Sequence, residues 1–465
     1  MKENVRQEFI KNFSKSLKRK SASFFIGSGL SIKAGYPSWS SLLTDCANEI
    51  ELDIKKENKN LINLAQYYFN EKQKNRINES IKEKFADKIG DITEEHKVIA
   101  SLPIEDIWTT NYDTLIERSF DHYGIANTVI TNDESYVEID RDAKVKVFKM
   151  HGTVSKSKEC VITRDDYERY NTGHDIVLSQ LKSELCYKTF LFVGYSFSDM
   201  DVQFIFEQIR KSFNESKPQT HYFILKNLNE DDYDGNHDEY LYDLKKRKFY
   251  IKDIQRYGIT VLEIDDYSEI YDLLVDIRNC VFENNVLITG AYSEENEIKK
   301  DISDIAEKVS FSLITSGYTI YSGYGKNLGA DVVNGAFDAC SRKNLKFEEV
   351  AKFTPFPFKK RESDGKKKQY AEIRKKMISK TRIMIVISGE KNGKVSEGVL
   401  EEFRIAKDQN NLIIPIKCTG GAAAQVWDDL KEANQTNQYF LMLENEQDSE
   451  RIAQTVINMI KEWEK

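Results

Sequence analysis

Short apolar runs alternate with longer segments of helical period along this chain, and this alternation constrains its fold more than any other feature. The runs are rich in β-branched and aromatic residues, and strands separated by helices form parallel sheets that helices cover. The first series comprises SFFIG (23–27), DIWTT (106–110), KVFKM (146–150), TFLFVG (189–194), HYFIL (221–225) and ITVLEI (259–264). Helical segments such as LINLAQYYFNE separate the first two runs. The series predicts a doubly wound α/β domain with a helical insertion.

A second, shorter series follows the segment DIRNCVFENN (276–285). Its runs are VLITG (286–290), YTIYSG (318–323), RIMIVISG (382–389) and NLIIPI (411–416). A chain of 465 residues exceeds one ordinary core, which also favours two domains. Phe9, Ile10, Phe13 and Leu17 have the spacing of an amphipathic helix that packs on the body or on a partner subunit. We therefore expect a helix over 1–20, a first α/β domain over 21–280 and a smaller Rossmann-like domain over 284–465.

Charge and composition exclude several function classes. The net charge of −8 argues against a general nucleic-acid binder, because such proteins neutralise phosphates with Lys and Arg. We find no apolar stretch long enough to span a membrane, and the N-terminal residues lack the apolar core of a signal peptide, which favours a cytoplasmic protein. The six cysteines stand singly, without the spacing of metal ligands, so no metal site is expected.

The stretch FFIGSGLS (24–31) takes the first strand into a glycine turn. Gly27 and Gly29 have no Cβ, so backbone N–H groups around Ser28 can approach a pyrophosphate closely. The pattern is neither GxGxxG nor a P-loop, and a purely structural turn is an equal alternative.

Two further strands of the first series end in polar groups. TTNYDTLIE (109–117) carries Asn111 and Asp113, and FKMHGTV (148–154) carries His151. The carboxyl ends of parallel strands share one edge of the sheet, so these side chains should converge on one crevice. His151 alone could be a structural histidine, and Asp113 could instead cap the helix that follows it.

These motifs and VGYSFSD (193–199), in this order, resemble those of sirtuin-type NAD-binding domains over residues 10–275. The resemblance implies that Asn111 and Asp113 lie by the nicotinamide ribose and carboxamide, and that His151 lies by the ribose hydroxyls. The other NAD+ contacts it implies are Gly27, Ser28, Gly29 and Ser31 in the glycine turn and Ser196 on the adenosine side.

One departure from that family concerns zinc. Sirtuin deacylases carry a four-cysteine zinc module after the histidine, whereas this interval holds only Cys160 and Cys186. The resemblance then implies hydrolysis of NAD+ to nicotinamide and ADP-ribose, with NAD+ as substrate and no metal. Asn111 would orient the ribose and the attacking water, and His151 would polarise a ribose hydroxyl or accept the proton of the water.

The second series also has glycines where strands end, in VLITGAYSE and YSGYGKNLGADVVNGAF. Such turns before helices bind phosphates, although vacant turns of a scaffold are an alternative. Arg374 could meet a phosphate, and Glu402 could accept hydrogen bonds from a ribose diol, with Glu397 and Glu401 as rivals. The arrangement resembles nucleotide-sensing SLOG domains, and the ligand positions carried over from them are Gly290, Gly323, Gly325, Arg374, Lys391 and Glu402.

A sirtuin-like domain followed by a SLOG domain is similar to the Thoeris anti-phage effectors of the ThsA type. That resemblance implies a homo-oligomer whose SLOG domain binds a cyclic ADP-ribose isomer made by a TIR-domain protein, after which the first domain depletes NAD+. The alternatives are a constitutive NADase whose second domain mediates assembly, a non-catalytic NAD+ or ADP-ribose scaffold, and a zinc-free deacylase.

Overall fold

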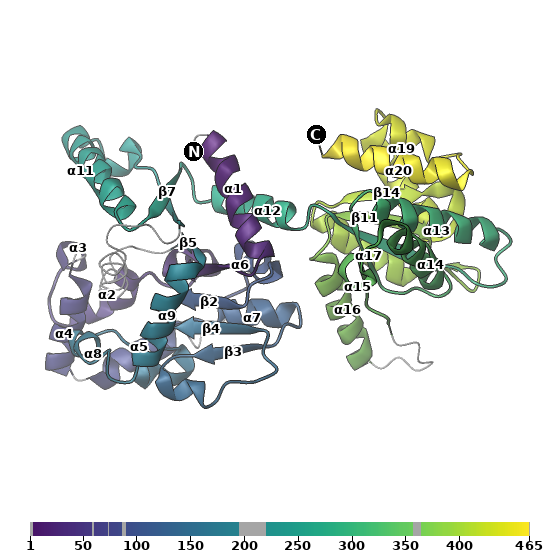
Figure 1. Cartoon of the computed structure of the whole chain (residues 1–465). Helices are drawn as coiled ribbons and strands as arrows, with labels where there is room; N and C mark the ends of the chain where they lie inside the picture. Colours follow the sequence, from purple (N-terminus) through teal and green to yellow (C-terminus); the bar gives the residue numbers. More distant parts are fainter. Residues whose placement is uncertain are drawn as a thin grey trace. The chain divides into compact units, whose positions relative to one another are not determined.

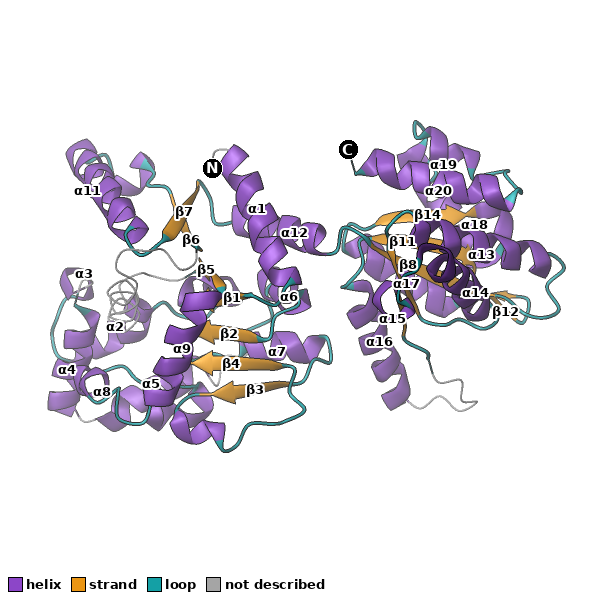
Figure 2. Ribbon diagram, in the orientation of Figure 1, coloured by secondary structure: helices purple, strands orange, loops and turns teal. Residues whose placement is uncertain are grey.

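The computed structural model divides the chain into two compact units, Met1–Val281 and Phe282–Lys465. It describes residues 3–57, 60–72, 74–85, 90–194, 220–356 and 364–464 (Figure 1). In these ranges no helix is both long and apolar enough to cross a bilayer. Each unit contains a parallel sheet with helices on both faces, which confirms the predicted α/β class (Figure 2).

The sheet of the first unit has the strand order β3-β4-β2-β1-β5-β6-β7, and every pairing is parallel. All six strands predicted in the first series are present, whereas the short edge strand β3 was missed. The strands are β1 (Ala22–Ile26), β2 (Asp106–Thr109), β3 (Asn127–Ile130), β4 (Val145–Lys149), β5 (Thr189–Val193), β6 (His221–Lys226) and β7 (Ile259–Ile264).

Adjacent phenylalanines on β1 show how the two faces of this sheet are covered. Successive strand residues point to opposite faces. Phe24 meets Phe13 of α1 (Glu3–Lys18), with ring centroids 5.4 Å apart. Phe25 belongs instead to the core that contains Leu181 and Leu185 of α9 (Asp175–Tyr187). The buried face of the N-terminal helix is thus used for packing within its own unit.

A predominantly helical segment between β1 and β2 forms the predicted insertion and has its own apolar core. It comprises the 3-10 turns η1 (Ser28–Leu30) and η2 (Ile32–Ala34) and the helices α2 (Trp39–Glu49), α3 (Ile54–Glu57), α4 (Leu61–Lys72), α5 (Lys74–Phe85) and α6 (Glu94–Ser101). The other described helices of this unit are α7 (Leu115–His122), α8 (Arg164–Glu168), α11 (His237–Gln255) and α12 (Glu269–Val281), with 3-10 turns η3 (Asp133–Tyr136), η4 (Val154–Glu159) and η5 (Glu230–Tyr233).

The sheet of the second unit has the order β10-β9-β8-β11-β14, again wholly parallel. Its strands are β8 (Asn285–Ala291), β9 (Thr319–Ser322), β10 (Ala351–Phe353), β11 (Ile383–Ser388) and β14 (Leu412–Ile416), and β12 (Glu390–Lys391) with β13 (Lys394–Val395) forms a separate hairpin. The four strands of the second series are confirmed, whereas β10 and the hairpin were not predicted.

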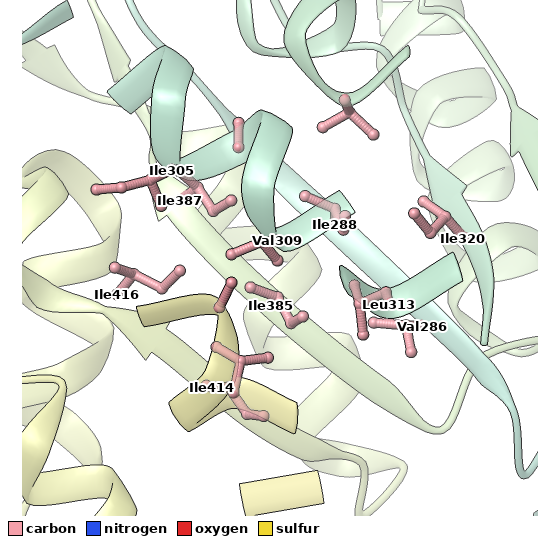
Figure 3. Close-up of a cluster of buried hydrophobic side chains, with 14 of the residues drawn as sticks. Val286, Ile288, Ile305, Val309, Leu313, Ile320, Ile385, Ile387, Ile414 and Ile416 are labelled. Atoms are coloured by element: carbon pink, nitrogen blue, oxygen red, sulfur yellow. The ribbon is translucent and has the colours of Figure 1, made fainter. Parts of the chain in front are cut away.

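Apolar side chains from both faces of β8 form the core of the second unit. Val286 and Ile288 pack with α13 (Lys299–Thr315), α14 (Leu328–Lys343) and α20 (Ser449–Trp463), as Figure 3 shows in part. Leu287 points to the other face, toward residues of α16 (Asp364–Ile378), α17 (Glu397–Asp408) and α18 (Gly421–Leu430). The remaining helices are α15 (Phe347–Val350) and α19 (Gln438–Met442), with 3-10 turns η6 (Lys417–Thr419) and η7 (Glu432–Asn434).

In both sheets the chain first winds to one side of the opening strand and later crosses to the other. The reversal lies between β1 and β5 in the first unit and between β8 and β11 in the second. Open α/β sheets bind ligands beyond the carboxyl ends of the strands at such a reversal. The fold therefore directs attention to the segments that follow these strands.

Candidate functional site

The glycine turn after β1 packs directly against the end of β5. The Gly27 N–H donates to the carbonyl oxygen of Val193 at 2.9 Å, and the Gly29 N–H donates to that of Gly194 at 2.8 Å. A Cβ at position 29 would lie 3.0 Å from the Gly194 oxygen. The missing side chain of Gly29 therefore permits a close backbone contact, while Ser28 and Gly29 themselves are exposed.

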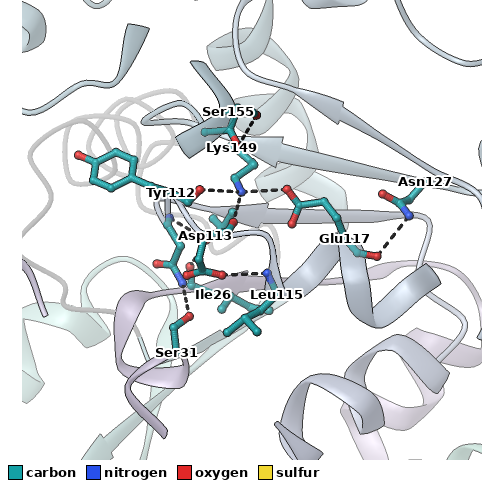
Figure 4. A network of polar contacts seen from close by, with 12 residues as sticks. Ile26, Ser31, Tyr112, Asp113, Leu115, Glu117, Asn127, Lys149 and Ser155 are labelled. Atoms are coloured by element: carbon teal, nitrogen blue, oxygen red, sulfur yellow. Dashed lines mark hydrogen bonds and ion pairs between the residues drawn. The ribbon is translucent and has the colours of Figure 1, made fainter. Parts of the chain in front are cut away.

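Asn111 is held by both the strand that precedes it and the glycine turn. The Thr109 hydroxyl donates to the Ile26 carbonyl oxygen at 2.8 Å and accepts from the Asn111 N–H at 2.9 Å. Asn111 Nδ2 donates to Ser31 Oγ at 3.2 Å (Figure 4). The Asn111 side chain is buried, yet its Oδ1 has no hydrogen-bond partner among the residues that the structure describes. A buried acceptor of this kind is costly unless a ligand or water satisfies it.

Asp113 is buried at the start of α7. Its Oδ1 accepts from the Leu115 N–H at 3.0 Å, so it makes a helix-start contact of the type considered as an alternative. The buried His96 of α6 interacts electrostatically with this carboxylate. Burial lowers the pKa of His96 to about 4, although Asp113 and Glu95 oppose the shift.

His151 follows β4 as Asn111 follows β2. Thr109 and Lys149 are register partners in the parallel pair, so Asn111 and His151 each stand two residues beyond a paired position. His151 is buried, and its Nε2 lies 3.5 Å from the Tyr167 hydroxyl. The sheet thus brings Asn111 and His151 to neighbouring strand ends.

Other predicted features of the first unit are placed as follows. Ser196 lies outside the described residues. Cys160 is buried and Cys186 is half-buried, and their thiols donate to the carbonyl oxygens of Thr153 and Lys182, respectively. Within the described ranges, no group of three His, Cys, Asp or Glu side chains could hold a metal ion.

In the second unit, the predicted residue Arg374 lies beside the buried carboxylate of a second predicted residue, Glu402. Its Oε2 accepts a hydrogen bond from Thr289 Oγ1, and its Oε1 lies 3.5 Å from Arg374 Nε. Arg374 also pairs with Glu401 through Nη1 at 2.6 Å. Burial raises the pKa of Glu402, although Thr289 and Arg374 oppose the shift. Glu397, the third candidate, pairs with Arg404 in an exposed salt bridge.

The predicted glycines of this unit allow close packing around the same edge of the sheet. A Cβ on Gly325 would lie 1.9 Å from the Gly290 oxygen, and one on Gly323 would lie 2.7 Å from Phe356 Cε2. The guanidinium of Arg374 lies 5.2 Å from the centre of the Phe356 ring. Gly290, Gly323 and Gly325 therefore lie in the packing that surrounds Arg374 and Glu402.

Lys391 is exposed on the β12–β13 hairpin. Its neighbour Glu390 accepts from Ser293 Oγ at 3.0 Å, from Asn296 Nδ2 and from the Gly393 N–H at 2.8 Å. These contacts tie the hairpin to the segment after β8. They lower the pKa of Glu390, chiefly through the Gly393 N–H.

Sequence reasoning missed several residues that build these sites. Thr109 ends β2, and Thr289 lies two residues before the end of β8; the Thr109 hydroxyl bonds to the neighbouring strand β1, and the Thr289 hydroxyl bonds to Glu402 of α17. Phe356, in a segment without a clear period, packs on Arg374. A signal for Thr109 was present, because a hydroxyl at a strand end can satisfy the backbone where the ladder stops.

Comparison with known proteins agrees with this architecture. Residues 105–247 match the SIR2-like domain family, and residues 269–463 match the Sir2- and TIR-associating SLOG family, STALD. The NAD(+) hydrolase ThsA of Bacillus cereus is 36% identical over 92% of this chain and 90% of its own. The ThsA proteins of Enterococcus faecium and Acinetobacter baumannii are 35% and 34% identical, over 91% and 92% of this chain and 90% and 91% of theirs.

These relatives span both units, and the two family models occur in the order that the sequence motifs predicted. Identity above 30% over nine-tenths of both chains indicates that this chain shares the fold and the reaction class of these relatives. The chain therefore belongs to the ThsA family of NAD(+) hydrolases.

Proposed function

We propose that this NAD+ hydrolase cleaves its substrate beside Asn111 and His151, and that a cyclic ADP-ribose isomer bound at the second unit activates it. The activated enzyme depletes NAD+ in an infected cell, as an abortive-infection defence against phage. The signal comes from a TIR-domain protein, and the enzyme works as a homo-oligomer.

The buried Oδ1 of Asn111 is the observation that carries the active-site proposal. It is unpaired within the described part of the chain, while Nδ2 of the same amide is fixed to Ser31. An amide oriented in this way offers its oxygen to a ribose hydroxyl or to the attacking water. The exposed Ser28 and Gly29 would then lie against the pyrophosphate, with Gly27 beside them.

The proposed chemistry needs little acid catalysis. Cleavage of the glycosidic bond develops positive charge on the ribose, while the cationic nicotinamide leaves as a neutral molecule. Water attacks the anomeric carbon, and Asn111 orients this water and the ribose. His151, next to the Tyr167 hydroxyl, polarises a ribose hydroxyl or accepts the proton of the water. Asp113 contacts the carboxamide through the oxygen that does not accept from Leu115.

Two features favour hydrolysis over transfer to an acyl-lysine. Cys160 and Cys186 are the only cysteines between His151 and β5, whereas sirtuin-like zinc modules use four. The ThsA relatives are named NAD(+) hydrolases. Water is accordingly the acceptor in this proposal.

Arg374 and Glu402 support the proposal of a nucleotide signal at the second unit. They lie together near the carboxyl end of β8, and doubly wound sheets bind nucleotides at the carboxyl ends of their strands. The guanidinium suits a phosphate, and the carboxylate suits a ribose diol. Gly290, Gly323 and Gly325 shape the backbone around them, and Lys391 offers a second cation from the hairpin.

The test is release of nicotinamide from NAD+ by the purified chain, with and without each of several cyclic ADP-ribose isomers. Release that depends on one isomer is the expected result. Release without any isomer would replace the proposal by a constitutive NADase, and an absence of release in every condition would favour a non-catalytic scaffold. In infected cells that also hold the TIR-domain protein, NAD+ should fall with the wild-type chain and persist with Asn111→Ala.

A further inference from the structure

A buried lysine contacts the backbone that directly follows Asn111 of the proposed active site. Lys149 is the last residue of β4, and its side chain is only 1% exposed. Its ammonium donates to the carbonyl oxygen of Asp113, to that of Tyr112 at 3.4 Å and to Glu117 Oε1 at 2.9 Å (Figure 4). Lysine is almost never buried without a partner, because its charge loses the solvation of water.

The three acceptors belong to two segments, the loop after β2 and helix α7. Tyr112 and Asp113 directly follow Asn111 beyond β2, whereas Glu117 lies in the first turn of α7. An ammonium has three donor hydrogens, and these three contacts use all of them. The lysine therefore joins β4 to the backbone that carries Asn111.

We propose that Lys149 is a positioning residue for NAD+ hydrolysis. It fixes the carbonyl groups next to Asn111 and stands two residues before His151, so a single side chain sets the spacing of the two segments that carry the reaction. The side chains of a catalytic site must be placed to within less than about 1 Å, and buried charge-assisted hydrogen bonds hold the backbone that carries them in position. The inference rests on the proposed active site.

The same sheet contains a second buried lysine that serves as a matched control. Lys188 is 5% exposed and pairs with Asp106 and, at 3.3 Å, with Glu184. It precedes β5, and Asp106 opens β2, so this cluster lies at the amino ends of the strands. Lys149 and Lys188 are alike in burial and pairing, but Lys149 lies at the carboxyl ends of the strands and Lys188 lies at their amino ends.

The experiment compares Lys149→Met, Lys188→Met and Asn111→Ala in the full-length chain. Nicotinamide release is measured in the condition in which the wild-type chain turns over NAD+, together with the thermal unfolding midpoint. Both methionine variants should lose similar stability. Lys149→Met should lose about 100-fold in kcat with KM changed by less than about threefold, because misplacement by about 1 Å has this cost. Lys188→Met should keep kcat within about threefold of the wild type.

Glu117→Gln is a second variant that keeps an acceptor for Lys149 while it removes the charge, and it serves if Lys149→Met does not fold. It should lower kcat about tenfold at unchanged KM. If Asn111→Ala is inactive, either of two results would overturn the inference. One is that Lys149→Met has the same kcat as Lys188→Met, and the other is that Glu117→Gln has the wild-type kcat. Wild-type turnover by Asn111→Ala would instead overturn the proposed active site.

Discussion

The side-chain amide of Asn111 donates a hydrogen bond to the Ser31 hydroxyl, 3.2 Å away and eighty residues earlier in the chain. This bond joins the segment after β2 to the glycine turn after β1. It also fixes which end of the amide is free, because Nδ2 is occupied while Oδ1 has no partner within the described ranges. A buried acceptor whose amide is oriented by a hydrogen bond is the kind of group that an enzyme uses to orient a substrate.

Asn111→Ala should therefore lower the kcat of NAD+ cleavage about 100-fold or more. The free energy of unfolding should change by only about 1 kcal/mol, because one hydrogen bond to Ser31 is lost. Asn127→Ala is the control, since Asn127 on β3 also bonds through its amide, to Asp121, at the far edge of the sheet. Equal turnover by the two variants in a nicotinamide-release assay would contradict the role of Asn111.

The strands that form the centres of both sheets could be predicted from the sequence, because a strand covered on both faces is a nearly continuous apolar run. FFI and IMIVI are examples, and both are buried throughout. β3 was missed because its four residues NTVI are only alternately buried, as on a sheet edge. The β12–β13 hairpin has two residues in each strand, too few for any period to be visible.

The candidate sites were predictable only in part. Polar residues at strand ends identified Asn111 and His151, because topology brings such ends together. Lys149 was hidden, since a lysine in KVFKM looks like a solvent-facing position of an alternating strand. Its burial depends on carbonyl groups and on Glu117, which lie more than thirty residues away and are not visible in local sequence.

Gly290→Ala should unfold or misfold the second unit locally. Gly290 has a φ of +150°, and an added Cβ would lie 1.8 Å from the Ile387 carbonyl oxygen of the adjacent central strand. We expect a loss of about 3 kcal/mol or more. Gly393→Ala is the matched control, because Gly393 also has a positive φ, +73°, but has open space around its Cβ position. Its cost should be about 1 kcal/mol.

Limited proteolysis of the second unit and the thermal unfolding midpoint measure both glycine effects. If Gly290→Ala resists protease as well as Gly393→Ala does, the contact between β8 and β11 at this position is not tight.

His221 should make the first unit less stable in acid. Burial lowers the pKa of His221 from 6.5 to about 4, although a hydrogen bond to the Leu185 backbone opposes the shift. Its Nδ1 accepts from the Phe190 N–H at 3.2 Å, and a protonated ring could not accept this bond. The unfolded chain thus binds the proton between pH 6.5 and 4 while the folded chain does not. Stability from this group is full above pH 6.5 and falls as the pH drops toward 4, by about 3 kcal/mol in all.

His221→Gln tests this dependence, because glutamine can accept and donate without titrating. Between pH 6.5 and 4, the free energy of unfolding of the variant should fall less steeply with falling pH than that of the wild type. The difference in slope should correspond to close to one proton taken up on unfolding. Thermal or urea unfolding at several pH values measures the slope. Parallel curves for the two proteins would mean that His221 is not held neutral.

Arg374→Ala should abolish activation without destroying the NAD+ hydrolase site. Arg374 is the cation beside the buried Glu402, and it is largely covered by Glu401 and the Phe356 ring. Removal of the guanidinium deletes the proposed phosphate contact, so the isomer that activates the wild type should bind at least about 100-fold more weakly.

Arg404→Ala on the same helix as Glu402 is the matched control, because Arg404 forms only an exposed salt bridge with Glu397, of a kind worth less than about 1 kcal/mol. Calorimetry with the activating isomer and nicotinamide release over a range of its concentrations measure both steps. An Arg374→Ala chain that responds at the same concentration as Arg404→Ala would place the signal elsewhere, whereas an Arg374→Ala chain that binds the isomer normally yet stays inactive would make this arginine a relay and not a ligand.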